Sequence, residues 1–198
     1  LINMVNALLD LARIEARQGR DLKLERCRLV DLLRDAVAPF AADEASGRLR
    51  VAMAGCTDWL WVDPEKTLRV FTNVLSNAFK YSPTETPIDL SVLRGQLRGD
   101  PAIGVRVRDR GMGMTPEQLE RVFERFYRAD PSGNIPGTGL GMSLVKEITE
   151  LQGGEVDVGD GAEALQHVHH RVKRQHRQPA RGVSGAVCAC ACVCVCVC

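Results

Sequence analysis

Residues 63–81 read Asp-Pro-Glu-Lys-Thr-Leu-Arg-Val-Phe-Thr-Asn-Val-Leu-Ser-Asn-Ala-Phe-Lys-Tyr, and this stretch predicts a helix with two different faces. Aspartate at the N-cap and proline in the first turn are typical of a helix start. One face is apolar at helical spacing and is expected to enter a core: Leu68, Phe71, Leu75 and Ala78. The opposite face carries Asn73, Asn77, Lys80 and Tyr81. Asparagine is a poor helix former, so two of them one turn apart indicate a face selected for contacts.

A second informative stretch is Gly137-Thr138-Gly139-Leu140-Gly141, which directly precedes an apolar-periodic run over residues 142–151. Without a Cβ, glycine adopts positive φ and brings backbone N–H groups close to a ligand. A helix that begins there adds unpaired amides and the positive end of its dipole, a combination that suits phosphate. Alone, such a stretch is more often a simple turn. Residues 130–136, rich in Gly, Pro, Ser and Asn, predict a mobile loop in front of it.

The remaining body of the chain alternates short strands with helices. Alternating apolar residues predict strands near residues 22–26, 49–53, 59–62, 88–92, 103–107 and 155–158. Helical spacing predicts further helices over residues 1–18, 30–45 and 116–123. A polar turn joins the strands near 88–92 and 103–107, which is typical of an antiparallel hairpin.

Composition excludes several classes of protein. The 198 residues carry a net charge of +1, so no overall field favours nucleic acid, and we expect no nucleic-acid partner. No apolar run is long enough to cross a membrane. Only Cys27 and Cys56 lie in the body of the chain, which indicates a cytoplasmic protein without a disulfide framework. The chain begins at Leu1 inside a helical pattern, and we interpret it as a fragment of a longer protein.

The periodic patterns end near residue 160. We interpret residues 161–198 as a low-complexity or frame-shifted tail and expect it to be disordered. Its end alternates Val or Ala with Cys, which a GTGTGT nucleotide repeat would encode. One alternative is a Cys-x-Cys metal tail, because thiolates bind zinc or copper(I). Another is a nucleic-acid arm formed by the basic residues 171–181.

Four segments in one order resemble the ATP-binding domain of sensor histidine kinases, within the group that includes gyrase, Hsp90 and MutL. Residues 73–81 resemble its N box, 109–113 its first glycine box, 123–126 its F box and 137–141 its second glycine box. The resemblance covers residues 1–158. It implies an α+β fold, a two-layer α/β sandwich with a mixed sheet and helices on one face (the Bergerat-type ATP-binding fold). Residues 1–20 resemble part of the second helix of a dimerisation hairpin, and residues 21–160 the catalytic domain.

On the N-box helix, the resemblance implies a magnesium and phosphate site. Asn77 is the implied Mg²⁺ ligand, with Asn73 beside it, because magnesium takes oxygen ligands and shares phosphate oxygens with the protein. Lys80 is placed to meet phosphate as a point charge. Tyr81 offers a ring that can lie near the adenine or the ribose.

Elsewhere in the site, the resemblance makes Asp109 the adenine anchor, whose carboxylate accepts a hydrogen bond from the exocyclic amine. Gly111 and Gly113 let the backbone pass close to the base. Either Arg125 or Arg128 is expected to reach the terminal phosphate of ATP. The triphosphate cradle and the hinge of the lid are expected at Gly137, Thr138, Gly139, Leu140 and Gly141.

Two departures from the family pattern limit these implications. The family's phosphoacceptor is a histidine on the first hairpin helix, and this chain has no histidine before His167. We therefore expect no acceptor, and no catalytic histidine, in this chain. The family also closes its sheet with a strand of Gly-x-Thr-x-Phe type, and nothing after Val158 matches it. We expect residues 155–158 to form an exposed sheet edge and the domain to be marginally stable.

The function implied by the resemblance is the ATP-binding catalytic domain of a sensor histidine kinase, which transfers the γ-phosphate of ATP to a histidine on another chain. The implied partners are a response regulator and a second copy through the dimerisation hairpin, and the longer protein can be anchored in the inner membrane. The alternative is a nucleotide-binding module, or a damaged gene product, without phosphotransfer. A gyrase-like ATPase is disfavoured, because Ser76 and Ala78 flank Asn77 and the helix carries no catalytic glutamate.

Overall fold

The computed structural model of the chain describes residues 20–97, 100–130, 135–159 and 191–197. The helix predicted over residues 1–18 and most of the tail therefore lie outside the described residues. Within those described ranges, no helix combines the length and the apolar character that crossing a membrane requires.

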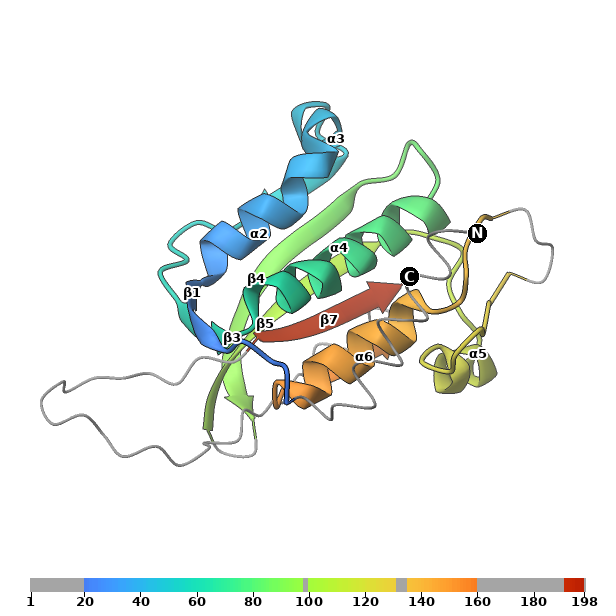
Figure 1. The fold of residues 1–198 in the computed structure, drawn as a ribbon. Coiled ribbons are helices and arrows are strands. Elements are labelled where there is room, and N and C mark those ends of the chain that lie inside the picture. Colours follow the sequence, from blue (N-terminus) through green and yellow to red (C-terminus); the bar gives the residue numbers. More distant parts are fainter. Residues whose placement is uncertain (1–19, 98–99, 131–134, 160–190, 198) are drawn as a thin grey trace, which may run out of the picture.

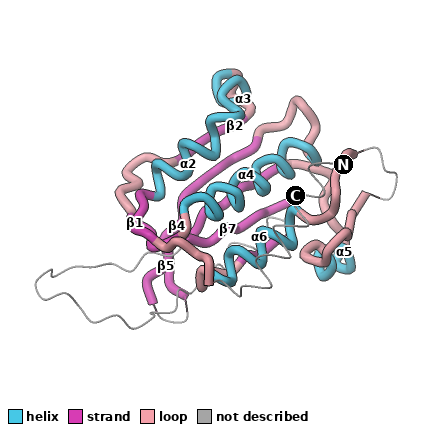
Figure 2. Tube along the Cα trace, in the orientation of Figure 1, coloured by secondary structure: helices cyan, strands magenta, loops and turns pink. Residues whose placement is uncertain are grey.

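A five-stranded mixed sheet forms one layer of the fold (Figure 2). Its order is β2 (Leu49–Ala52), β4 (Ile88–Leu97), β5 (Asp100–Asp109), β7 (Ala191–Val197) and β6 (Val156–Gly159). Only the β4–β5 pair is antiparallel; β2 with β4, β5 with β7 and β6 with β7 are parallel. The hairpin predicted from the alternating residues is thus confirmed.

Three helices form the second layer. Figure 1 shows α2 (Leu29–Val37), α4 (Pro64–Tyr81) and α6 (Gly141–Leu151) across one face of the sheet. The core lies between the layers, where Phe71 and Leu75 of α4 meet Val105 and Val107 of β5, all with at most 1% of their surface exposed. The two-layer α/β sandwich with a mixed sheet and helices on one face, predicted from the resemblance, is confirmed.

Helix α4 begins where the sequence predicts, because Asp63 caps its first turn. The side chain of Asp63 accepts a hydrogen bond from the backbone N–H of Lys66 (3.0 Å), as an N-cap should. Its other carboxylate oxygen accepts from the backbone N–H of Lys23 (2.9 Å). The backbone N–H of Asp63 donates to Gln152 Oε1 (2.7 Å), just after the end of α6. Asp63 therefore joins α4, α6 and the chain entering the domain.

The single helix predicted over residues 30–45 is divided in the structure. Helix α2 ends at Val37, a 3₁₀ turn covers Ala38–Phe40, and α3 spans Ala41–Ala45. Pro39 explains the break, because proline lacks the N–H that an α-helix interior needs and its ring clashes with the preceding turn.

A separate two-stranded antiparallel sheet is formed by β1 (Glu25–Arg28) and β3 (Trp59–Val62). The first strand was expected near residues 22–26 and begins later. The N–H of Lys23 is bonded to Asp63 rather than to a neighbouring strand, so the ladder starts after it.

The end of the chain corrects one expectation. The sequence predicted no strand after residue 158, yet Ala191–Val197 form β7, between β5 and β6. The strict alternation of small apolar residues with cysteine has the two-residue period of a strand, which residues 191–197 satisfy. Strand β6 still lies at the end of the sheet, as expected, but with β7 along its inner side. The other tail residues, with the alternatives of a metal tail or a basic arm, lie outside the described residues.

Candidate functional site

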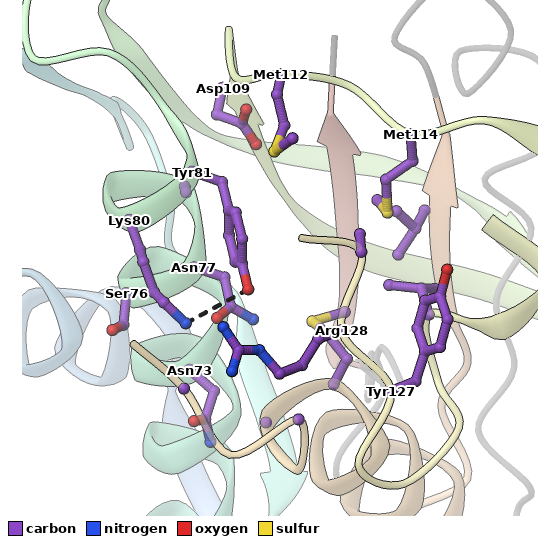
Figure 3. Close-up of a pocket in the computed structure, with 18 of the residues that line it drawn as sticks. Asn73, Ser76, Asn77, Lys80, Tyr81, Asp109, Met112, Met114, Tyr127 and Arg128 are labelled. Carbon is purple, nitrogen blue, oxygen red and sulfur yellow. Dashed lines mark hydrogen bonds between the residues drawn. The ribbon is translucent and has the colours of Figure 1, made fainter. Parts of the chain in front are cut away.

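A cavity of about 310 Å³ lies between α4, the turn after β5, residues 127–129 and the glycine loop before α6 (Figure 3). The structure brings most of the predicted site residues to its wall. Those that line it are Asn73, Asn77, Lys80, Tyr81, Asp109, Gly113, Arg128, Gly137, Thr138, Gly139 and Gly141.

The polar face of α4 forms one wall of the cavity. Asn73 donates its side-chain N–H to the carbonyl of Arg69 (3.0 Å), which fixes the amide and leaves Oδ1 on the side of Gly141. Lys80 lies over the ring of Tyr81, with 4.7 Å between the ammonium nitrogen and the ring centroid, and its nitrogen is 3.4 Å from the Tyr81 hydroxyl. Figure 3 shows the guanidinium of Arg128 approaching these side chains from the opposite wall. Two cations therefore face one space, which favours an anion there.

Asp109 places a carboxylate at another wall of the cavity. It is 1% exposed, and its Oδ1 accepts hydrogen bonds from the N–H of Gly111 (2.7 Å) and the hydroxyl of Ser82 (3.2 Å). Burial raises the pKa of Asp109, and these two hydrogen bonds offset only part of that rise. Within the described part of the chain, Oδ2 has no hydrogen-bond partner, so it can accept one from a ligand.

The glycine loop fits closely against its neighbours. A Cβ on Gly137 would collide with Lys80 Nζ, and one on Gly141 would lie 3.5 Å from Asn73 Oδ1. Gly139 has a φ of +70° and accepts a hydrogen bond from the N–H of Phe126 (2.9 Å). Helix α6 begins at Gly141, so its unpaired N–H groups open toward the cavity wall that this loop forms.

Three predicted residues do not line the cavity. Leu140 is buried, and its carbonyl accepts a bond from the N–H of Leu144 in the first turn of α6. Gly111 lies behind Asp109, where a Cβ would be 2.7 Å from the carbonyl oxygen of Tyr81. Arg125 forms an ion pair with Glu147 of α6 (3.8 Å).

The two arginines that the sequence left as alternatives thus occupy different places. Arg128 lines the cavity, and one of its terminal nitrogens donates to the carbonyl of Ile135 (2.5 Å). Another contact joins Arg128 to Asp130, at 4.0 Å between nitrogen and oxygen. Its Nε is buried and has no partner among the described residues. Arg128 therefore lines the cavity, whereas Arg125 does not.

Sequence reasoning did not foresee the apolar part of the wall. Among the chain's five methionines, Met112, Met114 and Met142 line the cavity. The further residues that were not predicted are Ser76, Ala78, Val122, Tyr127, Ala129, Pro136 and Val158. The sequence signal for this wall was the pair of methionines inside the Asp-Arg-Gly-Met-Gly-Met turn, because flexible thioethers in a turn can pack against a bound ring.

These groups fit a nucleotide with a magnesium ion. The methionines offer an apolar wall to a base, Asp109 an acceptor, and Lys80, Arg128 and the loop amides donors to phosphate. Among residues 20–97, 100–130, 135–159 and 191–197, no three His, Cys, Asp or Glu side chains cluster as a metal site. A cation here would therefore depend on an amide oxygen, such as that of Asn77, and on phosphate oxygens.

Comparison with known proteins assigns the chain to a family. Residues 62–183 match the family of histidine kinase-, DNA gyrase B-, and HSP90-like ATPases. The chain belongs to this family. Sensor histidine kinase YkoH of Bacillus subtilis is 35% identical over 159 residues, which are 78% of this chain and 33% of YkoH. Sensor protein kinase WalK of Staphylococcus haemolyticus is 36% identical over 97 residues, which are 48% of this chain and 16% of WalK. The chain thus spans a third or less of these relatives.

Solved structures similar to this chain are also sensor histidine kinases. The mycobacterial sensor histidine kinase MprB superposes with a TM-score of 0.51 at 26% identity, covering 66% of this chain and 81% of that one. Full-length ShkA in complex with AMPPNP gives a TM-score of 0.59 at 23% identity, over 78% of this chain and 31% of ShkA, which shows the shared fold. The chain is a catalytic domain of the sensor histidine kinase type, as the four sequence boxes predicted.

Proposed function

We propose that this domain binds Mg–ATP in the cavity and transfers the γ-phosphate to a histidine outside the domain, in two-component signalling. The observation that carries the proposal is the carboxylate of Asp109, whose Oδ2 has no hydrogen-bond partner among the described residues and which shares a cavity with Lys80 and Arg128. A carboxylate on the cavity wall with an oxygen that lacks a protein partner can accept a hydrogen bond from a ligand.

At the base end, Asp109 Oδ2 accepts a hydrogen bond from the exocyclic amine of adenine. Guanine presents a carbonyl oxygen at the equivalent position, which would oppose the carboxylate, so Asp109 selects adenine. The side chains of Met112, Met114 and Met142 cover the faces of the base, because flexible thioethers pack well against aromatic rings.

At the phosphate end, Lys80 and Arg128 meet the phosphate oxygens, and the N–H groups of residues 137–141 donate to them at the start of α6. Asn77 supplies one oxygen ligand to Mg²⁺. Such an ion would neutralise the negative charge that develops on the phosphates during transfer.

The transfer needs an acceptor from elsewhere. The histidines of the chain stand at positions 167, 169, 170 and 176, after the last segment that resembles the family. A nitrogen of an acceptor imidazole forms a bond to the γ-phosphorus while the bond from that phosphorus to the β–γ bridging oxygen breaks, and ADP leaves with the bonding electrons. In the whole protein, a dimerisation hairpin carries this histidine and a response regulator takes the phosphoryl group.

Binding of a fluorescent ATP analogue to Asp109→Asn and to Asp35→Asn tests the site. Asp35 is exposed on α2, so its variant is a charge-matched control. We expect Asp109→Asn alone to abolish binding, and ATP to displace the analogue from the control far better than GTP. Equal binding by both variants would show that the nucleotide is not held by Asp109.

Transfer has its own test, with labelled ATP and a separate protein that carries a histidine-bearing dimerisation hairpin. The expected result is labelling of the hairpin protein only when the domain is present. ATP binding without any labelling would instead support a second function, a nucleotide-binding module without phosphotransfer, which the lack of a histidine before His167 favours.

A further inference from the structure

Both tryptophans of the chain lie on one exposed face of the small β1–β3 sheet. Trp59 is 42% exposed and Trp61 is 55% exposed, whereas Leu60 and Val62, which alternate with them, are at most 2% exposed. Strand β3 thus turns one side to the core and presents two indole rings on the other. Large exposed rings side by side mark a surface that binds something.

Cationic side chains share this face with the rings. In the β1–β3 register, Arg26 lies opposite Trp61 and Arg28 opposite Trp59. The Arg26 guanidinium stacks over the Trp59 ring, with 4.4 Å between its central carbon and the ring centroid. Leu24, two residues before Arg26 in the chain, is 36% exposed and is the one aliphatic side chain that we assign to this surface.

Part of this positive charge is not neutralised. Arg28 has a carboxylate partner in Asp31, at 3.6 Å. Among the described residues, neither Arg26 nor the exposed Lys23 is ion-paired with a carboxylate. The face therefore combines two rings with the uncompensated cation of Arg26, and its partner should be anionic.

We propose that the face formed by Leu24, Arg26, Trp59 and Trp61, hereafter the tryptophan face, docks on an anionic lipid surface. Tryptophan prefers the membrane–water interface, where its ring meets the acyl boundary and its N–H remains hydrated. Arginine keeps its charge among the phosphates while its stem lies along apolar surface. A partner helix would need an aliphatic groove, and this face offers one leucine.

The position of the tryptophan face suits such docking. Figure 1 shows β1 and β3 at one end of the molecule and α5 (Pro116–Arg121), which lies beside the cavity, at the other. A domain that rests on lipid through this end keeps its cavity open to solution. The proposal is independent of the nucleotide site and goes beyond the proposed function.

Intrinsic fluorescence of the full chain tests the proposal, because both tryptophans report from this one face. Vesicles of phosphatidylcholine, with or without phosphatidylglycerol, are added to the protein. We expect a blue shift of the emission only with phosphatidylglycerol, reversed by added salt. The basic residues 171–181 contain no tryptophan, so their own binding to vesicles would not produce the shift.

Three variants sharpen the test. Trp61→Thr keeps a β-forming residue at an exposed position and should abolish the shift of Trp59. Arg26→Gln should weaken vesicle binding about fivefold, the effect of one cation near an anionic surface. Arg50→Gln, at an exposed arginine on β2, is the matched control and should leave binding unchanged. Unchanged circular dichroism shows that each variant is folded.

Three results would overturn the proposal. One is an emission spectrum that anionic vesicles leave unchanged. Another is equal weakening by Arg26→Gln and Arg50→Gln, which would mean general charge attraction. The third is free protein whose emission is already blue and shielded from iodide, which would mean that a protein segment covers the tryptophan face.

Discussion

The ammonium nitrogen of Lys80 lies directly against Gly137, where any larger side chain would collide with it. The contact joins the end of α4 to the glycine loop and fixes where one of the two cations of the cavity stands. Glycine is needed at position 137 because it leaves room for the Lys80 ammonium group. Its conformational freedom is not the reason.

We expect Gly137→Ala to weaken ATP binding about tenfold, because the added methyl group displaces Lys80 from the phosphates. The fold should be almost unaffected, with a change of less than about 0.5 kcal/mol in the free energy of unfolding, since a flexible side chain can move aside. Titration with a fluorescent ATP analogue measures the first effect and urea denaturation the second. In a Lys80→Ala background the substitution should have little further effect on affinity.

Gly139→Ala is the contrasting variant in the same loop. Here φ is +70°, and the added Cβ would lie 2.6 Å from the backbone of Phe126, which cannot swing away. We expect a loss of about 2 kcal/mol in the free energy of unfolding together with loss of ATP binding. If both glycine variants have the same stability, the tight contact between Gly139 and Phe126 is not present in solution.

Asp63→Ala should lower the free energy of unfolding by about 2 kcal/mol, because it removes the N-cap of α4 and the acceptor for Lys23. Burial alone would raise the pKa of Asp63, but hydrogen bonds from Lys23 and Lys66 and the Lys66 charge lower it below its ordinary value of 3.8. Its contribution is therefore complete above that value and is lost as the pH falls through the lower pKa of the folded state. Urea denaturation of both proteins at several pH values should show the difference shrinking in acid; a constant difference would contradict it.

The contribution of Asp109 to stability should depend on pH in the opposite sense from that of Asp63, because burial raises the pKa of Asp109. The folded state holds the proton more tightly than the unfolded state, so this group reduces stability as the pH rises from 3.8 through the raised pKa. Asp109→Asn keeps an oxygen acceptor for Ser82 and Gly111. At neutral pH and without nucleotide, it should be at least as stable as the parent protein, although it does not bind ATP. A marked loss of stability in thermal melts at pH 7 would contradict this.

Arg128→Ala and Arg125→Ala form a matched pair for the phosphate end. We expect Arg128→Ala to weaken ATP binding about tenfold and ADP binding far less, because a charged hydrogen bond to the terminal phosphate is lost. Arg125→Ala removes an ion pair with Glu147 outside the cavity and should change neither affinity. Competition titrations with both nucleotides measure the two variants, and equal effects of the two would contradict this assignment.

The features that the sequence predicts correctly are those determined by residues close together in the chain. The bounds of α4 depend on Asp63, the following proline and a regular apolar stripe, and all three lie within the helix itself. The break at Pro39 is also local and was missed only because the apolar pattern continues across it. The four sequence boxes identified the family because their order and spacing are specific.

The choice between Arg125 and Arg128 and the position of strand β7 depend on contacts between residues that are far apart in the chain or in irregular segments. Arg125 and Arg128 are three residues apart in an irregular segment, where Phe126 has a φ of +64° and no periodicity indicates which arginine faces the cavity. The strand β7 takes its place through pairing with β5 and β6, which are far away in the sequence. Such pairing has no sequence signature beyond simple alternation.

The Val-Cys repeat in β7 allows the strand to pair with β5 in more than one register. Val193 pairs with Val105, and Val195 pairs with Val107. Because Val and Cys alternate through residues 192–198, a slide of two residues that brings Val195 opposite Val105 also brings Val197 opposite Val107. Nucleotide repeats gain and lose units easily. A gene that gains one Val-Cys unit in this run would therefore still supply the sheet with an equivalent strand.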